Sequence, residues 1–295
     1  MVSSIVGNYL YGKGLISYEQ LNDILIEQRK VRVKLGLIAV AEGLLMQEEA
    51  DRINELQAVM DKRFGDIAVE KKYLTEGQVE ALLKKQGNAY LAFAQVLENK
   101  QLMTIEQLEQ YMVDFQRENS FTISDMEDIK SDDVDRILPL FLPEGGEKYL
   151  NIAGTALRTL MRCVDTEIYV DKAYLTDTFE ADNCVLQYVE GEHDTTSSIA
   201  GKGKALLPIA ITFGKEDFTE INEDSLDAVA ELLNCINGLY ATTLSQCGIS
   251  MELYPPELAP EIGSLKANQM LVLPLTIKGQ QVNFVVAIDH RIEMK

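Results

Sequence analysis

The chain has 295 residues and is acidic, with 27 Lys and Arg against 47 Asp and Glu and a net charge of −20 at pH 7. Residues 1–120 hold 14 basic and 18 acidic residues and the remainder 13 and 29, so most of the charge lies in the second half. Such a surface repels nucleic acids and anionic membranes, and neither is expected as a partner. No apolar run approaches the roughly 18 residues of a membrane helix, and the N-terminus does not have the pattern of a signal peptide. We therefore expect a cytoplasmic protein, long enough for two domains.

An internal repeat with a period of 29 residues fills the first part of the chain. Three sets of residues are equivalent under this period: Ile16, Leu45, Leu74 and Met103; Leu21, Ala50, Val79 and Leu108; and Gly7, Gly36, Gly65 and Ala94. Ser17, Thr75 and Thr104 are each followed three residues later by Gln, the pattern of a helix capping box. Each unit thus predicts a short helix, a turn and a longer helix. We expect residues 1–118 to form an all-helical domain of four such units, because no unit buries its apolar side alone.

The repeat segments GLISYEQLNDILIEQ, GLLMQEEADRINELQ and YLTEGQVEALLKKQ resemble the N-terminal helical repeats of type II secretion and type IV pilus ATPases. In the MshE-type version of that domain, two motifs of 24 residues separated by five residues bind cyclic di-GMP, and residues 34–57 and 63–86 have this spacing. The resemblance implies a ligand site made of Lys34, Gly36, Gln57, Arg63, Gly65 and Gln86. Lys34 lacks the forked donors of an arginine, and Lys72 stands in place of a motif glycine. The alternative is that the glycines only maintain helix packing.

Residues 119–145 interrupt the repeat. They contain a run of acidic residues followed by Pro139, Pro143 and Gly145, which indicates a loop. We expect an acidic linker here, with a short helix around Asp132–Leu138.

The second half, residues 146–295, alternates helical and β-rich segments. The patterns predict helices over Lys148–Arg162 and Asp224–Gln246. They predict strands over Glu167–Leu175, Cys184–Val189, Ala205–Thr212, Ile249–Tyr254, Met270–Ile277 and Gln281–Ile288. The last two strands form a hairpin across Lys278-Gly279-Gln280. The fold class expected for the whole chain is α+β.

The predicted helix Asp224–Gln246 combines a broad apolar face with a narrow polar stripe. The stripe consists of Asp227, Glu231, Asn234 and Gly238, which fall on one line at about 100° per residue. A carboxylate and a carboxamide one turn apart can hold a cationic partner and orient a water, and a glycine lets a partner surface approach. The alternative is a solvated face with a packing glycine.

This stripe resembles the signature helix of the CheC/CheX/FliY phosphatases, which dephosphorylate the chemotaxis response regulator CheY. The resemblance implies that Glu231 docks the regulator by a salt bridge to a lysine, that Asn234 positions the attacking water, and that Asp227 and Gly238 support the docking face. It also implies a CheX-like fold with two long helices on a mostly antiparallel sheet, a homodimer, and Mg²⁺ carried by the regulator. The first helix has Ala153, Thr155 and Ala156 where a second stripe would lie, so one site per chain is expected.

No intrinsic metal or cofactor is expected. Cys163, Cys184, Cys235 and Cys247 lack metal-binding spacing, and His193 and His290 are far apart in sequence. The cysteines are expected to be buried free thiols.

The sequence therefore predicts an enzyme, a CheX-like phosphatase acting on the aspartyl phosphate of a receiver domain. The alternative is a non-catalytic signalling adaptor or receptor, in which the helical repeats bind a partner or cyclic di-GMP.

Overall fold

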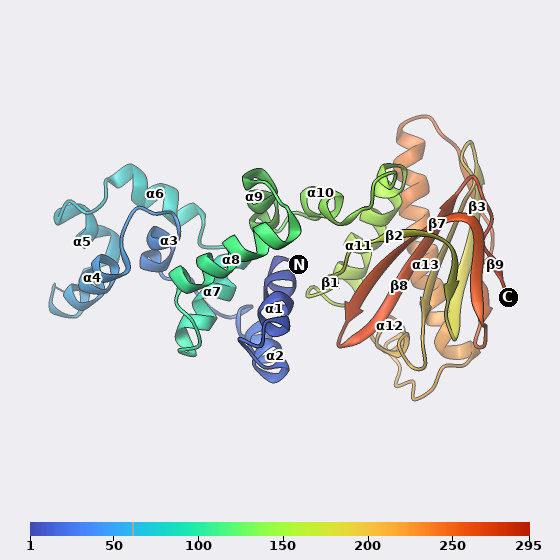
Figure 1. Cartoon of the computed structure of the whole chain (residues 1–295), viewed down its shortest axis with the longest axis horizontal. Helices are drawn as coiled ribbons and strands as arrows, with labels where there is room; N and C mark the ends of the chain where they lie inside the picture. Colours follow the sequence, from blue (N-terminus) through green and yellow to red (C-terminus); the bar gives the residue numbers. More distant parts are fainter. Residues whose placement is uncertain (61) are drawn as a thin grey trace. The chain divides into compact units, whose positions relative to one another are not determined.

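The structure is a computed structural model that describes residues 1–60 and 62–295 (Figure 1). Two compact units are found, Val2–Asp133 and Val134–Lys295, with Met1 grouped with the second unit. The first unit is helical and the second combines helices with a sheet (Figure 1). Among the residues that the structure describes, none of the helices combines the length and apolar character that a membrane crossing requires.

The N-terminal unit contains four helix pairs that follow the 29-residue period. They are α1 (Val2–Gly12) with α2 (Tyr18–Glu27), α3 (Leu35–Ala41) with α4 (Gln47–Met60), α5 (Phe64–Glu70) with α6 (Glu76–Lys84), and α7 (Ala89–Asn99) with α8 (Ile105–Asn119). The capping boxes predicted at Ser17, Thr75 and Thr104 are confirmed, because each side chain accepts the backbone N–H three residues on and the partner glutamine reciprocates. Sequence periodicity and capping thus predict these helices correctly.

The turn between the two helices of each unit has a residue in the left-handed conformation. Gly14, Gly43, Lys72 and Gln101 have φ values of 71°, 67°, 62° and 55°, at intervals of one period. This conformation ends a helix and is easiest for glycine. Lys72 therefore keeps the turn of its glycine equivalents at some cost in backbone strain.

The repeat glycines allow the two helices of a unit to approach each other closely. A Cβ atom built on Gly65 would lie 2.8 Å from Val79 Cγ1, and one on Gly36 would lie 3.4 Å from Ala50 Cβ and 3.1 Å from Phe64. The contacted residues Val79 and Ala50 are themselves equivalent under the repeat. Helix packing is therefore sufficient to explain why these positions are glycine.

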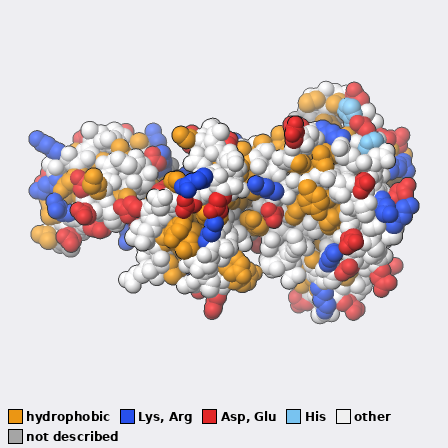
Figure 2. All heavy atoms as spheres, in the orientation of Figure 1, with side chains coloured by type: hydrophobic (Ala, Val, Ile, Leu, Met, Phe, Trp, Pro, Cys, Tyr) orange, Lys and Arg blue, Asp and Glu red, His pale blue; other side chains and the backbone are white. Residues whose placement is uncertain are grey.

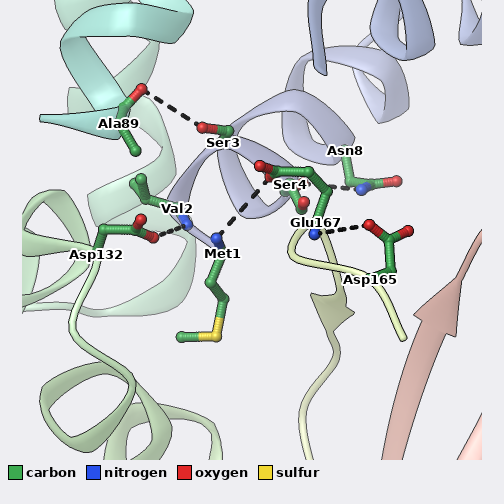
Figure 3. Close-up of polar contacts among 9 residues, drawn as sticks. All are labelled: Met1, Val2, Ser3, Ser4, Asn8, Ala89, Asp132, Asp165 and Glu167. Carbon is green, nitrogen blue, oxygen red and sulfur yellow. Dashed lines mark hydrogen bonds and ion pairs between the residues drawn. The ribbon is translucent and has the colours of Figure 1, made fainter. Parts of the chain in front are cut away.

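The expected linker is wrong for the first part of residues 119–145, which forms a helix, whereas the short helix expected around Asp132–Leu138 is found at Val134–Ile137. Helix α9 (Ile123–Ser131) packs against α1 and α7, and Asn88 Nδ2 donates to the carbonyl of Lys130 at 2.9 Å. Asp132, just after α9, accepts the Val2 N–H at the start of α1 at 2.7 Å (Figure 3). The acidic composition of this segment is typical of a loop, but the segment forms an amphipathic helix whose apolar face consists of Met126 and Ile129. The boundary between the units falls at Asp133, followed by α10 (Val134–Ile137) and the 3₁₀ helices η1 (Leu138–Phe141) and η2 (Glu147–Tyr149).

The C-terminal unit contains three longer helices and one sheet. The helices are α11 (Leu150–Cys163), α12 (Leu207–Gly214) and α13 (Glu223–Gln246). The strands are β1 (Tyr169–Val170), β2 (Tyr174–Glu180), β3 (Asn183–Gly191), β4 (Thr195–Gly201), β5 (Met251–Leu253), β6 (Glu257–Ala259), β7 (Ser264–Ile277), β8 (Gln280–Ile288) and β9 (Glu293–Met294). The order is β1-β7-β8-β4-β3-β5, with β2 and β9 on β7 and β6 on β3, and every pair is antiparallel. The helical first unit and the antiparallel sheet with its helices confirm the expected α+β class, with the two expected long helices found as α11 and α13.

The strand predictions need correction at several places. The segment Ala205–Thr212 is not a strand, because it contains helix α12, in which Pro208 occupies a first-turn position that suits proline. A short apolar run does not distinguish a buried strand from a buried helix. Strand β4 was missed, because its sequence TTSSIAG is polar although the strand is buried throughout. The short strands β6 and β9 were also missed, and the strand expected over Glu167–Leu175 is divided between β1 and β2.

Both faces of the sheet are covered. Helix α13 packs against β3, β4, β5 and β6 and also contacts α11 and α12. On the other face, a second core contains Cys184, Leu186, Ala200, Val272 and Val285, among others, and Phe179 and Met294 pack at its margin. Polar side chains on β3 and β4 that point toward α13 are therefore shielded from water, and this positions the site described next.

Candidate functional site

Helix α13 presents the predicted stripe on its exposed face. The helix starts with a capping box between Asn222 and Ser225, and its apolar residues Leu226, Val229, Leu233 and Ile236 are completely buried. The opposite side exposes Asp227, Glu231 and Asn234. The structure therefore brings these three polar side chains to one accessible surface.

The Asn234 carboxamide is hydrogen-bonded through its oxygen, and its NH₂ group is left exposed. Its Oδ1 accepts a hydrogen bond from Gln187 Nε2 at 2.8 Å, and the same nitrogen donates to the Tyr254 carbonyl at 2.8 Å. Gln187 lies on β3 and is only 1% exposed. In the described part of the chain, Asn234 Nδ2 has no hydrogen-bond partner. It is therefore available to an incoming molecule.

Glu231 and Gly238 flank Asn234 along the helix. No cationic side chain lies within ion-pair distance of Glu231 among the described residues, so its carboxylate can accept a cation from outside. A Cβ atom built on Gly238 would meet nothing within 4 Å. Packing within the unit therefore does not explain this glycine, in contrast to Gly65.

A hollow with a volume of 520 Å³ adjoins the first half of α13. Phe213, Gly214, Glu216 and Phe218 line it from the end of α12 and the loop that follows, and Asp224, Asp227, Ala228 and Glu231 line it from α13. Four of these side chains are acidic and none is basic. The hollow therefore combines an aromatic lining with a negative rim, which favours a partner that is positively charged.

The cysteines are free, but only Cys184 is fully buried; Cys163 is half-buried, and Cys235 and Cys247 are exposed. The expectation of four buried thiols is thus wrong for the last two, which lie on or just after the exposed side of α13. Partial burial raises the pKa of Cys235, helped by the nearby Cys163 and Glu231. A raised pKa reduces the thiolate fraction and disfavours a nucleophile beside Asn234.

No group of three His, Cys, Asp or Glu residues in the described ranges 1–60 and 62–295 is arranged to hold a metal. The acidic and basic side chains of the C-terminal unit are interspersed on the face drawn in Figure 2.

The residues predicted to bind a cyclic dinucleotide belong to the N-terminal unit. Lys34 and Arg63 are exposed and precede α3 and α5. Gln57 and Gln86 donate their side-chain N–H groups to main-chain carbonyls at 3.5 Å and 3.0 Å. Gly36 and Gly65 are explained by packing, and the Lys34 N–H donates to Gln95 Oε1 at 2.9 Å. These contacts give most of the six predicted ligand residues a structural role.

Sequence reasoning missed the residues that support Asn234. Gln187, Asn237 and Ser197 come from two strands and one helix, and the Tyr254 carbonyl comes from the loop after β5. One feature of the sequence could have indicated these supporting residues: Asn237 is a polar residue on the apolar face of α13. A buried amide at such a position requires hydrogen-bond partners.

The comparisons with known proteins concern the C-terminal unit. Residues 184–268, which include Glu231 and Asn234, match the family model described as chemotaxis phosphatase CheX. A chemotaxis protein CheX from Desulfovibrio desulfuricans has 15% identity and a TM-score of 0.42, over 48% of this chain and 99% of that chain. A CheC-like superfamily protein from Shewanella sp. PV-4 has 19% identity and a TM-score of 0.42, over 47% and 94%. A CheX–CheY–BeF₃–Mg²⁺ complex from Borrelia burgdorferi has 19% identity and a TM-score of 0.38, over 47% and 95%. No curated protein matches this chain.

Proposed function

We propose that the C-terminal unit hydrolyses the aspartyl phosphate of a CheY-type receiver domain. The observation that carries this proposal is the Asn234 carboxamide, which is exposed, fixed through its oxygen at 2.8 Å by a buried side chain, and one turn from an exposed carboxylate. The match of residues 184–268 to a family described as chemotaxis phosphatase supports the reaction class.

In the proposed reaction, Asn234 holds a water molecule through its Nδ2 group and directs it at phosphorus. A bond forms between the water oxygen and phosphorus while the bond from phosphorus to the aspartyl oxygen breaks. The products are inorganic phosphate and the free aspartate of the receiver. An acyl phosphate is already reactive, so positioning of the water supplies most of the acceleration. Mg²⁺ belongs to the receiver in this proposal, where it balances the charge of the phosphoryl group.

Docking of the receiver uses the acidic side of the same surface. Glu231 pairs with a lysine of the receiver, and Asp227 and the hollow beside it add negative potential. The open space around Gly238 admits the partner surface close to the helix. These features explain how an acidic protein approaches a phosphorylated partner, because it meets the cationic groups around the phosphate.

We include a homodimer in the proposal. Within the described residues, β2 pairs only with β7, so its outer edge leaves backbone groups that a second copy can use. Light scattering at micromolar concentration should give twice the chain mass of 33.0 kDa. A mass equal to one chain would exclude the dimer.

The test of the phosphatase is the loss of phosphate from a phosphorylated receiver domain, measured with and without the protein. We expect acceleration by the parental chain and a loss of roughly 10²-fold with Asn234→Ala, the scale of a misplaced reactant. The matched control is Asn54→Ala, which removes an exposed helical asparagine from the N-terminal unit and should leave the rate unchanged.

Other outcomes would point to the alternative functions. A parental chain that binds the receiver without acceleration would be a docking adaptor. Saturable binding of cyclic di-GMP that Arg63→Ala abolishes would identify the helical repeats as a receptor. Equal rates for the parental chain and Asn234→Ala would exclude the proposed mechanism.

A further inference from the structure

A chain of buried amides runs from the sheet to Asn234. Ser197 Oγ donates to Asn237 Oδ1 at 2.9 Å, Asn237 Nδ2 donates to Gln187 Oε1 at 2.7 Å, and Gln187 Nε2 donates to Asn234 Oδ1 at 2.8 Å. Ser197, Asn237 and Gln187 are 0%, 0% and 1% exposed. Of these four hydrogen-bonded side chains, only Asn234 lies at the surface, so the bonds connect the protein interior to the exposed carboxamide.

The donor and the acceptor of each hydrogen bond in this series of side chains follow from one group that can only accept, the Tyr254 carbonyl. The Tyr254 carbonyl cannot donate, so the Gln187 group that faces it at 2.8 Å is the NH₂ group. Gln187 Oε1 then faces Asn237, which must donate through Nδ2 and turn its oxygen to the Ser197 hydroxyl. The second hydrogen of Gln187 Nε2 points at Asn234, which must therefore present its oxygen inward and its Nδ2 outward.

The fold gives each member of the chain a rigid base. Gln187 on β3 and Ser197 on β4 are directly paired in the sheet, so their side chains lie next to each other on the face covered by α13. Asn234 and Asn237 are one turn apart on the helix. Burial strengthens these bonds and makes an unpaired member costly. The arrangement therefore restricts the Asn234 side chain far more than an exposed asparagine is normally restricted.

We infer that Gln187, with Asn237 and Ser197 behind it, is a positioning residue that fixes the Asn234 carboxamide with its Nδ2 group toward the attacking water. This inference deepens the proposed phosphatase function and rests on it. The buried residues do not touch the substrate. They act through Asn234, because both hydrogens of Gln187 Nε2 are used, one on Asn234 and one on the loop that carries Tyr254.

The kinetic test is a double-mutant cycle between Gln187→Leu and Asn234→Ala. Gln187→Leu should lower kcat about 10- to 100-fold and leave KM within about twofold, because the docking surface is unchanged. In the Asn234→Ala background the same substitution should change kcat less than twofold, since its target is gone. An equal loss in both backgrounds would show a general structural effect and overturn the inference.

A second variant, Gln187→Glu, distinguishes a loss of positioning from a loss of folding. Gln187→Glu keeps the shape and still accepts from Asn237, but the ionised carboxylate cannot donate to Asn234. Its kcat, divided by that of the parental protein, should rise as pH falls and the carboxyl group regains a donor hydrogen. A ratio that is independent of pH would contradict the positioning role.

An NMR measurement of how mobile the Asn234 side chain is tests this inference independently of the phosphatase proposal. In protein labelled with ¹⁵N-asparagine, the heteronuclear NOE of the Asn234 side chain, assigned with Asn234→Ala, should be high in the parental chain and low in Gln187→Leu. The matched control is Asn183→Leu, which removes another buried amide of β3 that bonds only to the Gly203 carbonyl among the described residues; it should leave the Asn234 signal unchanged. If the parental chain has no phosphatase activity, the proposed function fails and this NOE alone decides whether Asn234 is fixed. A mobile Asn234 in the parental chain would overturn the inference.

Discussion

Replacement of Gly238 by alanine should make the protein more stable and less active. Glycine in a helix interior costs about 0.5–1 kcal/mol relative to alanine, and a Cβ atom at this position meets nothing within 4 Å. The variant should therefore gain about 0.5–1 kcal/mol of unfolding free energy. For a unit of this size, that gain raises the melting temperature by roughly 1–4 °C.

The effect of Gly238→Ala on activity has the opposite sign, because the open space is proposed to hold the receiver. A methyl group forced into a closely packed interface costs about 1–3 kcal/mol. This corresponds to a loss of roughly 5- to 150-fold in kcat/KM. Gly77→Ala is the matched control, since it fills open space on helix α6 of the other unit and should change stability alone. Greater stability with unchanged kcat/KM in Gly238→Ala would refute close approach of a partner at this glycine.

Three further results are expected. Glu231→Gln should raise KM about 2- to 10-fold with little change in kcat and weaken the salt dependence of binding, because a docking charge is lost; a changed kcat at constant KM would contradict a docking role. Gly65→Ala should destabilise the N-terminal unit by about 1–3 kcal/mol, since its Cβ atom would lie 2.8 Å from Val79; a stabilised variant in denaturant unfolding would show that packing does not explain this glycine. Burial raises the pKa of Cys184 from 9.0 to about 11, so between these values the unfolded thiol ionises while the folded one stays protonated. Cys184 should therefore contribute a fall of about 2–3 kcal/mol in unfolding free energy as pH rises through this window, and in Cys184→Ala the total fall should be smaller by that amount.

The sequence was sufficient for elements whose signal is local. Helix α13 was predicted within one residue, because its apolar spacing and its polar stripe both follow the helical period. The capping boxes at Ser17, Thr75 and Thr104 gave the starts of three repeat helices for the same reason. The polar stripe on α13 was also visible, because its members are close in sequence.

The elements that were missed depend on tertiary contacts. The buried strand β4 carries Thr and Ser where apolar residues are usual. Thr195, Thr196 and Ser197 are tolerated there because their hydroxyl groups donate to His193, His290 and Asn237. Helix α9 was hidden by its acidic residues and is held by bonds to distant positions such as Asn88. Gln187 could not be connected to Asn234, because 46 residues separate them and the strand register that brings them together is not a local property.

The most direct measurement of the central claim is the first-order rate of phosphate loss from a phosphorylated receiver at saturating concentrations of this protein. The parental chain should exceed the spontaneous rate, and Asn234→Ala should fall about 10²-fold toward it while still binding the receiver. A saturating rate for Asn234→Ala equal to that of the parental chain would contradict the assignment of water positioning to this carboxamide.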